Sequence, residues 1–254
     1  MKCGSRKRTA APRAGHRTWL AVSGCAITIV LACGSALAAP GATLTGFPFS
    51  DEELNYTLKW PGGLTLGEGH LKAKHGNPDW EFALSLDGSI PGFALKDDYR
   101  ATAQGDLCTA VFERTSAHGT RKTAEKEIVD PARNMVRRET ALKGGGSSEF
   151  AVAPCVRDAL TFLFYSRREL GQGRVPAAGE LLFGSLYRAQ LDYAGAETVT
   201  VSGKPEISDK VAVTMKGPAS GFRFEMYFAR DAARTPLLIK VPFALGTFSM
   251  ELVR

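Results

Sequence analysis

Three histidines and one pair of adjacent aspartates are the residues best suited to catalysis or metal binding after the first 39 residues. His70 and His75 lie five positions apart, which puts them on opposite faces of a strand, so they are poor joint ligands for a metal ion. Asp97 and Asp98 would also point to opposite faces of a strand, and such a pair is typical of a solvated turn. The spacing therefore predicts no metal site and no cofactor.

The usual motifs for nucleophilic catalysis and phosphate binding do not occur in this sequence. It contains no Gly-x-Ser-x-Gly motif, which presents the serine of many hydrolases. The stretches Gly67–Gly69 and Gly144–Gly146 are not followed by the Lys-Ser/Thr of a phosphate-binding loop. We predict no catalytic residue and a non-enzymatic role. The enzyme alternative is a hydrolase of envelope polymers, for which Asp97, Asp98 and His118 are the candidate residues.

Cys108 and Cys155 are the two cysteines that follow the N-terminal segment, which itself holds Cys3, Cys25 and Cys33. Two cysteines in an exported domain are a disulfide candidate, and only one intramolecular pairing is available. A crosslink over such a loop stabilises a protein by roughly 3–4 kcal/mol. The alternative is two separate buried thiols.

The first 17 residues carry six basic side chains and no acidic one: Lys2, Arg6, Lys7, Arg8, Arg13 and Arg17. An uncharged stretch, Thr18–Ala39, follows and contains Ala36-Leu37-Ala38, whose small residues a signal peptidase reads. We predict a signal peptide over residues 1–38, a short linker over 39–46 and a single antiparallel β domain over 47–254. The stretch is also long enough for an uncleaved membrane anchor, but Thr, Ser, Gly and Cys dilute it.

A second export route is open at Cys33. The sequence Val30-Leu31-Ala32-Cys33 resembles a bacterial lipobox, in which the cysteine is lipidated and becomes the mature N-terminus. The expected location is the periplasm, with a membrane-anchored lipoprotein as the alternative. Acylation of Cys33 is the only membrane attachment that we expect after cleavage.

The positive charge of the chain belongs to its N-terminal segment. The chain has 32 basic and 26 acidic residues, and the segment accounts for the difference. A neutral domain has no overall field to attract nucleic acid, and no basic stripe with interleaved aromatic residues replaces it. Nucleic-acid binding is therefore excluded.

Most segments after residue 47 alternate between apolar and polar residues, which is the pattern of half-buried strands. In the stretch 80–86, for example, Trp80, Phe82, Leu84 and Leu86 share one face. About 14 such strands form a sheet that must curl or close, because flat sheets of that width are disfavoured. We predict a mostly β fold, an antiparallel meander forming a strongly curved sheet or incomplete barrel.

One segment, Cys155–Leu170, has helical periodicity instead. Its apolar stripe is predicted to pack on the concave face of the sheet and consists of Val156, Ala159, Leu160, Leu163 and Phe164. Asp158 in the first turn and Arg167 and Arg168 in the last match the helix dipole. Anion binding by Arg167 is the alternative reading of that residue.

Several aromatic residues exceed what one thin sheet needs and are candidates to face a ligand: Trp60, Trp80, Phe82, Phe222, Phe224 and Phe228. The leading hypothesis is that an apolar, lipid-like or amphipathic ligand, or a segment of an envelope protein, binds inside the curved sheet. Equally, these residues could fill a closed core. A third class of function is an interaction module that uses a free strand edge.

Short motifs resemble a known family of bacterial exported proteins. They are the opening Phe49–Tyr56 strand, Trp60 with Gly67-Glu68-Gly69, the Asp-Ala-Leu…Phe-Tyr-x-Arg pattern from Asp158 to Arg167, and Asp231…Thr235-Pro236-Leu237. In these the chain is similar to the domain of unknown function 3108. The resemblance implies a Gram-negative envelope protein with an antiparallel β fold and no established activity. It carries over no catalytic residue.

Overall fold

The computed structural model describes residues 51–254 except 77–78, 91, 143, 219 and 244–245. The predicted signal peptide, the linker and Cys33 lie outside the described residues. Eight strands precede the helix region: β1 (Glu52–Lys59), β2 (Thr65–His75), β3 (Trp80–Ile90), β4 (Phe93–Gln104), β5 (Cys108–His118), β6 (Arg121–Asp130), β7 (Met135–Thr140) and β8 (Ser147–Ala151). The others are β9 (Arg157–Asp158), β10 (Gly179–Leu182), β11 (Leu186–Val201), β12 (Lys204–Lys216), β13 (Gly221–Ala229), β14 (Pro236–Phe243) and β15 (Gly246–Leu252).

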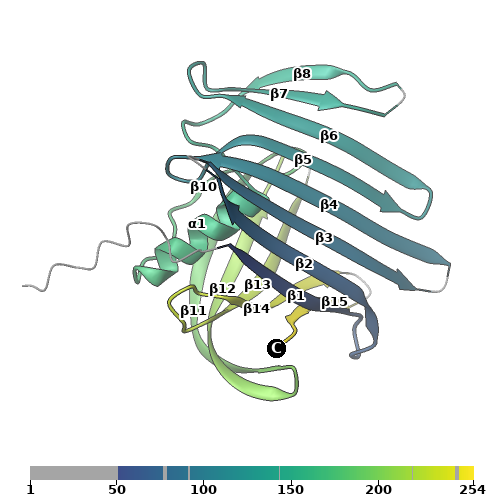
Figure 1. Ribbon diagram of the computed structural model, residues 1–254, viewed down its shortest axis with the longest axis vertical. Helices are drawn as coiled ribbons and strands as arrows, with labels where there is room; N and C mark the ends of the chain where they lie inside the picture. The colour runs from purple at the N-terminus through teal and green to yellow at the C-terminus, as the bar shows by residue number, and fades with distance from the viewer. Residues whose placement is uncertain (1–50, 77–78, 91, 143, 219, 244–245) are drawn as a thin grey trace, which may run out of the picture. The chain divides into compact units, whose positions relative to one another are not determined.

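All fifteen strands belong to one sheet, in the order β8-β7-β6-β5-β4-β3-β2-β1-β15-β14-β13-β12-β11-β10-β9 (Figure 1). The first and last long strands, β1 and β15, pair antiparallel in its middle, so the sheet grows outward from them in both directions. The prediction of a mostly β, strongly curved and incompletely closed sheet with one helix is confirmed. The sheet differs from the predicted antiparallel meander at one edge, where β9 pairs with β10 in parallel.

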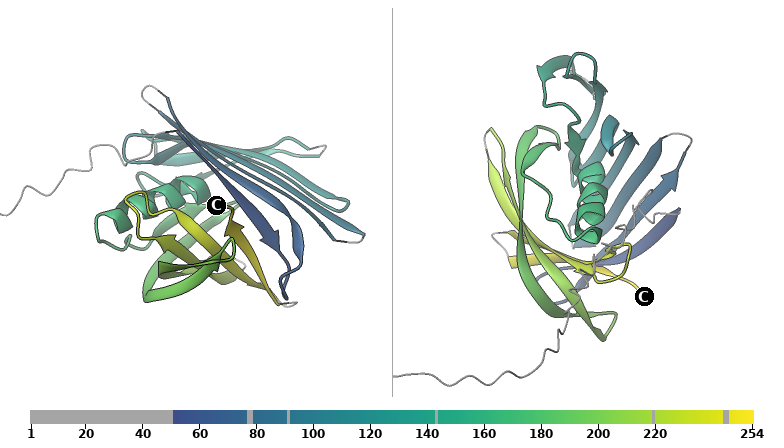
Figure 2. Two further views of the ribbon diagram at one scale, coloured as in Figure 1. Left: turned by 60° about the horizontal axis from the view of Figure 1, so that its bottom comes forward. Right: turned by 90° about the vertical axis from the view of Figure 1, so that its left-hand side faces the viewer.

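The alternation of apolar and polar residues decides which side of the sheet is buried. In β3, Phe82 is buried while its neighbour Glu81 is exposed. The helix α1 (Ala159–Gly171) packs on the side that carries Phe82, and the rings of Phe82 and Phe164 stack with centroids 4.1 Å apart. We call this side the inner face. Figure 2 shows α1 lying between the two halves of the curved sheet.

The helix begins later than the periodicity indicated. Cys155 has a φ of 56°, and Arg157 and Asp158 are extended in β9, so the predicted start at Cys155 was wrong. Asp158 is the N-cap residue and not part of the first turn: its Oδ1 accepts the N–H of Leu160 at 2.7 Å and that of Thr161 at 3.1 Å. These bonds satisfy the free amides of the first turn and set the start of the helix.

The predicted helix stripe divides between two clusters. Leu160, Leu163 and Phe164 are buried in the main core, and the half-buried Ala159 packs against it. Val156 precedes the helix and belongs to a second, smaller cluster with Val136, Val152 and Leu182. In the described part of the chain, no helix has the length and apolar character needed to cross a membrane.

Candidate functional site

Asp97 and His118 are far apart in sequence but hydrogen-bonded in the structure. Asp97 Oδ1 lies 2.8 Å from His118 Nε2, and the Asp97 side chain is only 7% exposed. The expectation of a solvated turn at Asp97-Asp98 was wrong, because both residues lie within β4. Their side chains do fall on opposite faces. Cross-strand pairing in β4 and β5 had no signal in the sequence, so this contact could not be predicted.

Further charged pairs continue this line across the inner face of β5, β6 and β7. Arg114 Nη2 lies 2.7 Å from Glu125 Oε2, and Arg138 Nε lies 2.9 Å from Glu127 Oε1. These residues are neighbours on adjacent strands in the ladder. We call the set the inner polar row: Asp97, His118, Arg114, Glu125, Glu127 and Arg138. It places paired, partly buried charges on a face that is otherwise apolar.

Burial shifts the ionisation of two groups in this region. Burial raises the pKa of Tyr99 above its ordinary value, and the Asp97 carboxylate adds to the rise, so the phenol stays protonated. Burial also raises the pKa of Glu127, while its bond to Arg138 opposes the rise. Glu127 Oε2 is buried without a hydrogen-bond partner among the described residues. Burying that oxygen without a partner penalises its charged form.

Two clusters of partly exposed aromatic side chains lie on the inner face, and the first of them adjoins the inner polar row. Tyr99 and Phe183 have ring centroids 5.7 Å apart, and the Arg114 guanidinium lies 5.5 Å from the Phe183 centroid. Tyr187 meets Phe222 edge-on at 5.8 Å, and Phe222 stacks on Phe224 at 6.0 Å. We call the two clusters together the inner apolar patch: Tyr99 and Phe183 in one, and Tyr187, Phe222 and Phe224 in the other. The row and the patch meet where Arg114 covers Phe183.

The six aromatic residues named from the sequence do not form one surface. Phe82 and Phe228 are fully buried, and Trp80 stacks on Phe82 at 6.0 Å. Trp60 lies apart from them against Phe248, at 4.6 Å. Only Phe222 and Phe224 belong to the inner apolar patch. Phe183 and Tyr187 were not among the residues named from the sequence. The chain turns at Gly184, whose φ is 65°. A glycine at this position was the sequence signal that could have indicated the turn.

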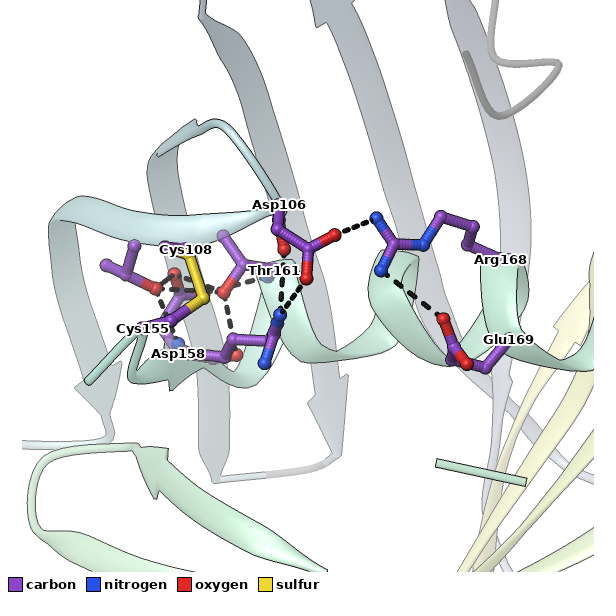
Figure 3. The surroundings of a disulfide bond; sticks show 9 residues. Asp106, Cys108, Cys155, Asp158, Thr161, Arg168 and Glu169 are labelled. Carbon is purple, nitrogen blue, oxygen red and sulfur yellow. Dashed lines mark hydrogen bonds and ion pairs between the residues drawn. A yellow bond between two sulfur atoms is a disulfide. The ribbon is translucent and has the colours of Figure 1, made fainter. Parts of the chain in front are cut away.

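A disulfide joins Cys108 at the start of β5 to Cys155 just before β9, with Cα atoms 4.7 Å apart (Figure 3). The disulfide thus holds the segment before β9, the edge strand at one end of the sheet, against β5. Strands β6, β7 and β8 continue the other end of the sheet beyond β5. Beside the disulfide, the Thr109 hydroxyl donates to Asp158 Oδ2 at 2.6 Å, and Asp158 N–H donates to Thr109 Oγ1 at 2.7 Å. We call this junction of β5 and β9 the seam.

Arg168 lies in the last turn of the helix, as the helix dipole favours, but both arginines also make specific side-chain contacts. The Arg167 side chain is fully buried and paired with Glu52 of β1, so the carboxylate it binds belongs to the protein. Arg168 binds Asp106 and lies 5.0 Å from the ring centroid of Tyr165. The Arg168 side chain is therefore largely covered, at 19% exposure. Neither partner carries a local sequence signal.

The remaining candidates lie elsewhere. His70 Nδ1 is 2.7 Å from Asn55 Oδ1, and His75 packs on Trp80. Within the described residues, no group of three or more His, Cys, Asp or Glu could hold a metal ion. A depression of about 510 Å³ on the outer face is rimmed by ion pairs such as Lys126–Glu113, at 2.7 Å, as expected for a solvated sheet surface.

The family assignment follows from comparison of the sequence. The family described as "Protein of unknown function (DUF3108)" matches residues 55–253, nearly the whole of the described chain. The chain belongs to this family. No curated protein matches the sequence.

The similarity of this DUF3108 protein to solved structures is one of fold, at low sequence identity. A β-barrel-like protein of the domain of unknown function DUF1849 from Brucella abortus matches with a TM-score of 0.60 at 8% identity, over 82% of this chain and 98% of that one. A protein with a YmcC-like fold from Bacteroides fragilis aligns over 82% of this chain and 97% of its own length, at 9% identity, but its TM-score is 0.31. The first supports a barrel-like arrangement of the curved sheet.

Proposed function

We propose that this DUF3108 protein is exported to the bacterial cell envelope. There it holds an apolar or amphipathic ligand against the inner face of its sheet, without catalysing a reaction. The observation that carries the proposal is the junction of the inner apolar patch with the inner polar row, where the Arg114 guanidinium lies 5.5 Å over Phe183. An amphipathic molecule has the same division into an apolar and a polar part.

The aromatic side chains of the inner apolar patch are partly exposed to solvent. Phe222 is 37% exposed, and its patch neighbours are half-buried although each packs against the core or another ring. Covering apolar surface stabilises a complex by roughly 25 cal/mol per Å². An acyl or similar chain laid on these rings would gain that energy. Its polar end would then meet charged groups of the row, which can donate and accept hydrogen bonds.

Export is supported by three features. The basic leader, the uncharged stretch and Ala36-Leu37-Ala38 have the order of a signal peptide. The family resemblance implies envelope proteins. A disulfide between Cys108 and Cys155 fits an oxidising compartment.

Native mass spectrometry of protein purified from a periplasmic extract tests ligand binding directly. A retained small molecule, or binding of a hydrophobic fluorescent dye, is the expected result. Phe222→Ala should weaken that binding. Ile207→Ala is the matched control, since Ile207 is more exposed, at 62%, and is not part of the patch. Ligand-free protein that binds no dye, or equal binding by the two variants, would overturn the proposal.

A second candidate function is hydrolysis of an envelope polymer, favoured by the bond between Asp97 and His118. A carboxylate that holds an imidazole is part of the usual apparatus for activating a nucleophile. Ser116 lies opposite Asp97 in the ladder, and its hydroxyl is hydrogen-bonded to Thr123. Single replacement of Asp97 and His118 tests this reading. If deletion of the protein has a phenotype and neither replacement reproduces it, the hydrolase reading is ruled out.

A further inference from the structure

The Cys108–Cys155 bond crosses a junction that is also held without it. Thr109 N–H donates to the carbonyl oxygen of Val156 at 3.0 Å, and Thr109 and Asp158 exchange two further hydrogen bonds. Thr109 and Val156 are the immediate neighbours of Cys108 and Cys155, and Asp158 follows Cys155 by three positions. Opening the disulfide would therefore leave β5 and β9 joined by hydrogen bonds that are buried. A bond that can open without loss of the fold meets the first requirement of a reversible redox site.

The two sulfur-bearing residues differ in accessibility. Cys155 is exposed, and it lies in a left-handed backbone conformation between the exposed Pro154 and the buried Val156. Cys108 is half-buried at the start of β5. Thiol–disulfide exchange requires that a thiolate reach one sulfur directly, so access decides which sulfur is attacked. The geometry favours attack at Cys155.

A cavity of about 190 Å³ opens beside Cys155. It is lined by the segments 153–157 and 177–180 together with Phe162 and Tyr165. Several of the lining residues have small side chains, among them Ala153, Ala177 and Ala178. The Arg157 guanidinium lies 3.7 Å from the Tyr165 ring centroid, and its Nε is buried without a hydrogen-bond partner among the described residues. The cavity thus places small and aromatic side chains, and the Arg157 guanidinium that also binds Asp106, beside Cys155.

We propose that the Cys108–Cys155 bond is a thiol–disulfide exchange site for a protein dithiol, and that this cavity receives the donor's peptide segment next to its cysteine. One donor thiolate attacks Cys155 Sγ, an intermolecular disulfide forms, and Cys108 Sγ leaves as a thiolate that takes up a proton. The second donor thiol then attacks its own partner sulfur and releases Cys155 as a thiol. The donor leaves oxidised to a disulfide, and the protein has gained two electrons and two protons. A cation close to a cysteine stabilises its thiolate, and Arg157 lines the same cavity as Cys155.

Exchange with a monothiol locates the attacked sulfur in the wild-type protein. After incubation with glutathione, acid quenching and alkylation of free thiols, peptide mass spectrometry should find glutathione on Cys155 and the alkyl group on Cys108. Glutathione found on Cys108, or exchange no faster than global unfolding, would overturn the proposal. The reduced protein should keep the circular dichroism spectrum of the oxidised one, and its unfolding on reduction would equally overturn it.

Filling the cavity separates docking from simple accessibility. Ala178→Trp should slow reduction by a thioredoxin-class dithiol protein about tenfold, which corresponds to about 1.4 kcal/mol of lost docking energy. Its reduction by dithiothreitol, which needs no docking, should be unchanged. Ala132→Trp, at an exposed turn, is the control and should change neither rate. Equal slowing with both reductants, or no slowing with the protein donor, would show that the cavity does not receive the donor.

Discussion

Arg167 in α1 and Glu52 in β1 form a two-bond ion pair in which the arginine side chain is fully buried. Arg167 Nη2 donates to Glu52 Oε2 at 3.1 Å, Nη1 donates to Oε1, and Nε donates to the carbonyl oxygen of Ala233 at 3.0 Å. One guanidinium thus ties the helix to β1 and to the turn between β13 and β14. It fixes where α1 lies on the inner face.

Replacing this arginine should be strongly destabilising. Arg167→Met keeps an unbranched side chain but leaves the Glu52 carboxylate without its partner. Removing one member of a buried pair costs about 3–5 kcal/mol, and the partial exposure of Glu52, at 17%, places the expected loss near the lower end. The measurement is the free energy of unfolding in urea. The double variant Arg167→Met/Glu52→Gln should recover part of the loss, and a double variant no more stable than the single one would contradict the coupling.

The strands and the body of the helix could be predicted because their signal is local. Alternation in Trp80–Leu86 identifies β3, and the spacing of Leu160, Leu163 and Phe164 identifies α1. The start of the helix was misplaced because the apolar periodicity extends back to Val156, whereas Asp158 caps the helix by accepting the N–H groups of Leu160 and Thr161. Periodicity alone could not distinguish Val156, packed beside the seam, from a residue of the helix stripe.

Pairing between distant charges left no trace in the sequence. Arg167 follows Glu52 by 115 positions, and His118 follows Asp97 by 21. Each residue has an ordinary local explanation, as a helix-end cation or a strand-surface polar group. The inner polar row exists because the register of β4 to β7 places these side chains next to one another, and register is set by the whole sheet. The disulfide was the exception, since only two of the five cysteines follow the predicted signal peptide.

Leu163 tests whether α1 stabilises the sheet. It is buried in the main core, and truncation of such a leucine costs about 2–5 kcal/mol. Leu163→Ala should therefore lower the midpoint of thermal unfolding markedly. Leu64→Ala is the matched control, because Leu64 is 65% exposed in the turn before β2. An unchanged midpoint for Leu163→Ala would mean that the helix is peripheral and better suited to docking a partner.

Arg168→Ala should lower the stability of the protein less than Arg167→Met or Leu163→Ala does. Its partner Asp106 is 63% exposed, so the ion pair is partly solvated and worth about 1 kcal/mol or less. The guanidinium also covers the Tyr165 ring, which adds packing that alanine lacks. Thermal unfolding of Arg168→Ala beside Leu163→Ala gives the comparison. A loss as large as that of Leu163→Ala would show that this contact also fixes the helix.

The N-terminus of the mature protein distinguishes the export routes. Intact-mass measurement should give a chain that starts at Ala39, as expected for cleavage after Ala36-Leu37-Ala38 and a soluble periplasmic product. A chain that starts at Cys33 with added acyl mass would establish the lipoprotein route instead. Retention of Met1 in a membrane fraction would contradict both.

Glu127 should make stability depend on pH with a defined sign. Burial raises the pKa of its carboxyl group, and Arg138 opposes the rise. A group with a raised pKa in the folded state binds its proton more tightly there than in the unfolded chain. Its stabilising contribution is complete below the ordinary glutamate pKa of about 4.3. That contribution is lost as the pH rises through the higher, folded-state pKa.

The variant Glu127→Gln keeps the shape of the protonated side chain and cannot titrate. The free energy of unfolding of the wild type minus that of Glu127→Gln should therefore fall as the pH is raised from the ordinary glutamate pKa towards neutrality. Urea unfolding at a series of pH values measures the difference. Arg138→Met should steepen the fall, because the cation that opposes the pKa rise is removed. A difference that grows with pH would mean that the ion pair outweighs burial, and that Glu127 belongs to the row as a stabilising anion.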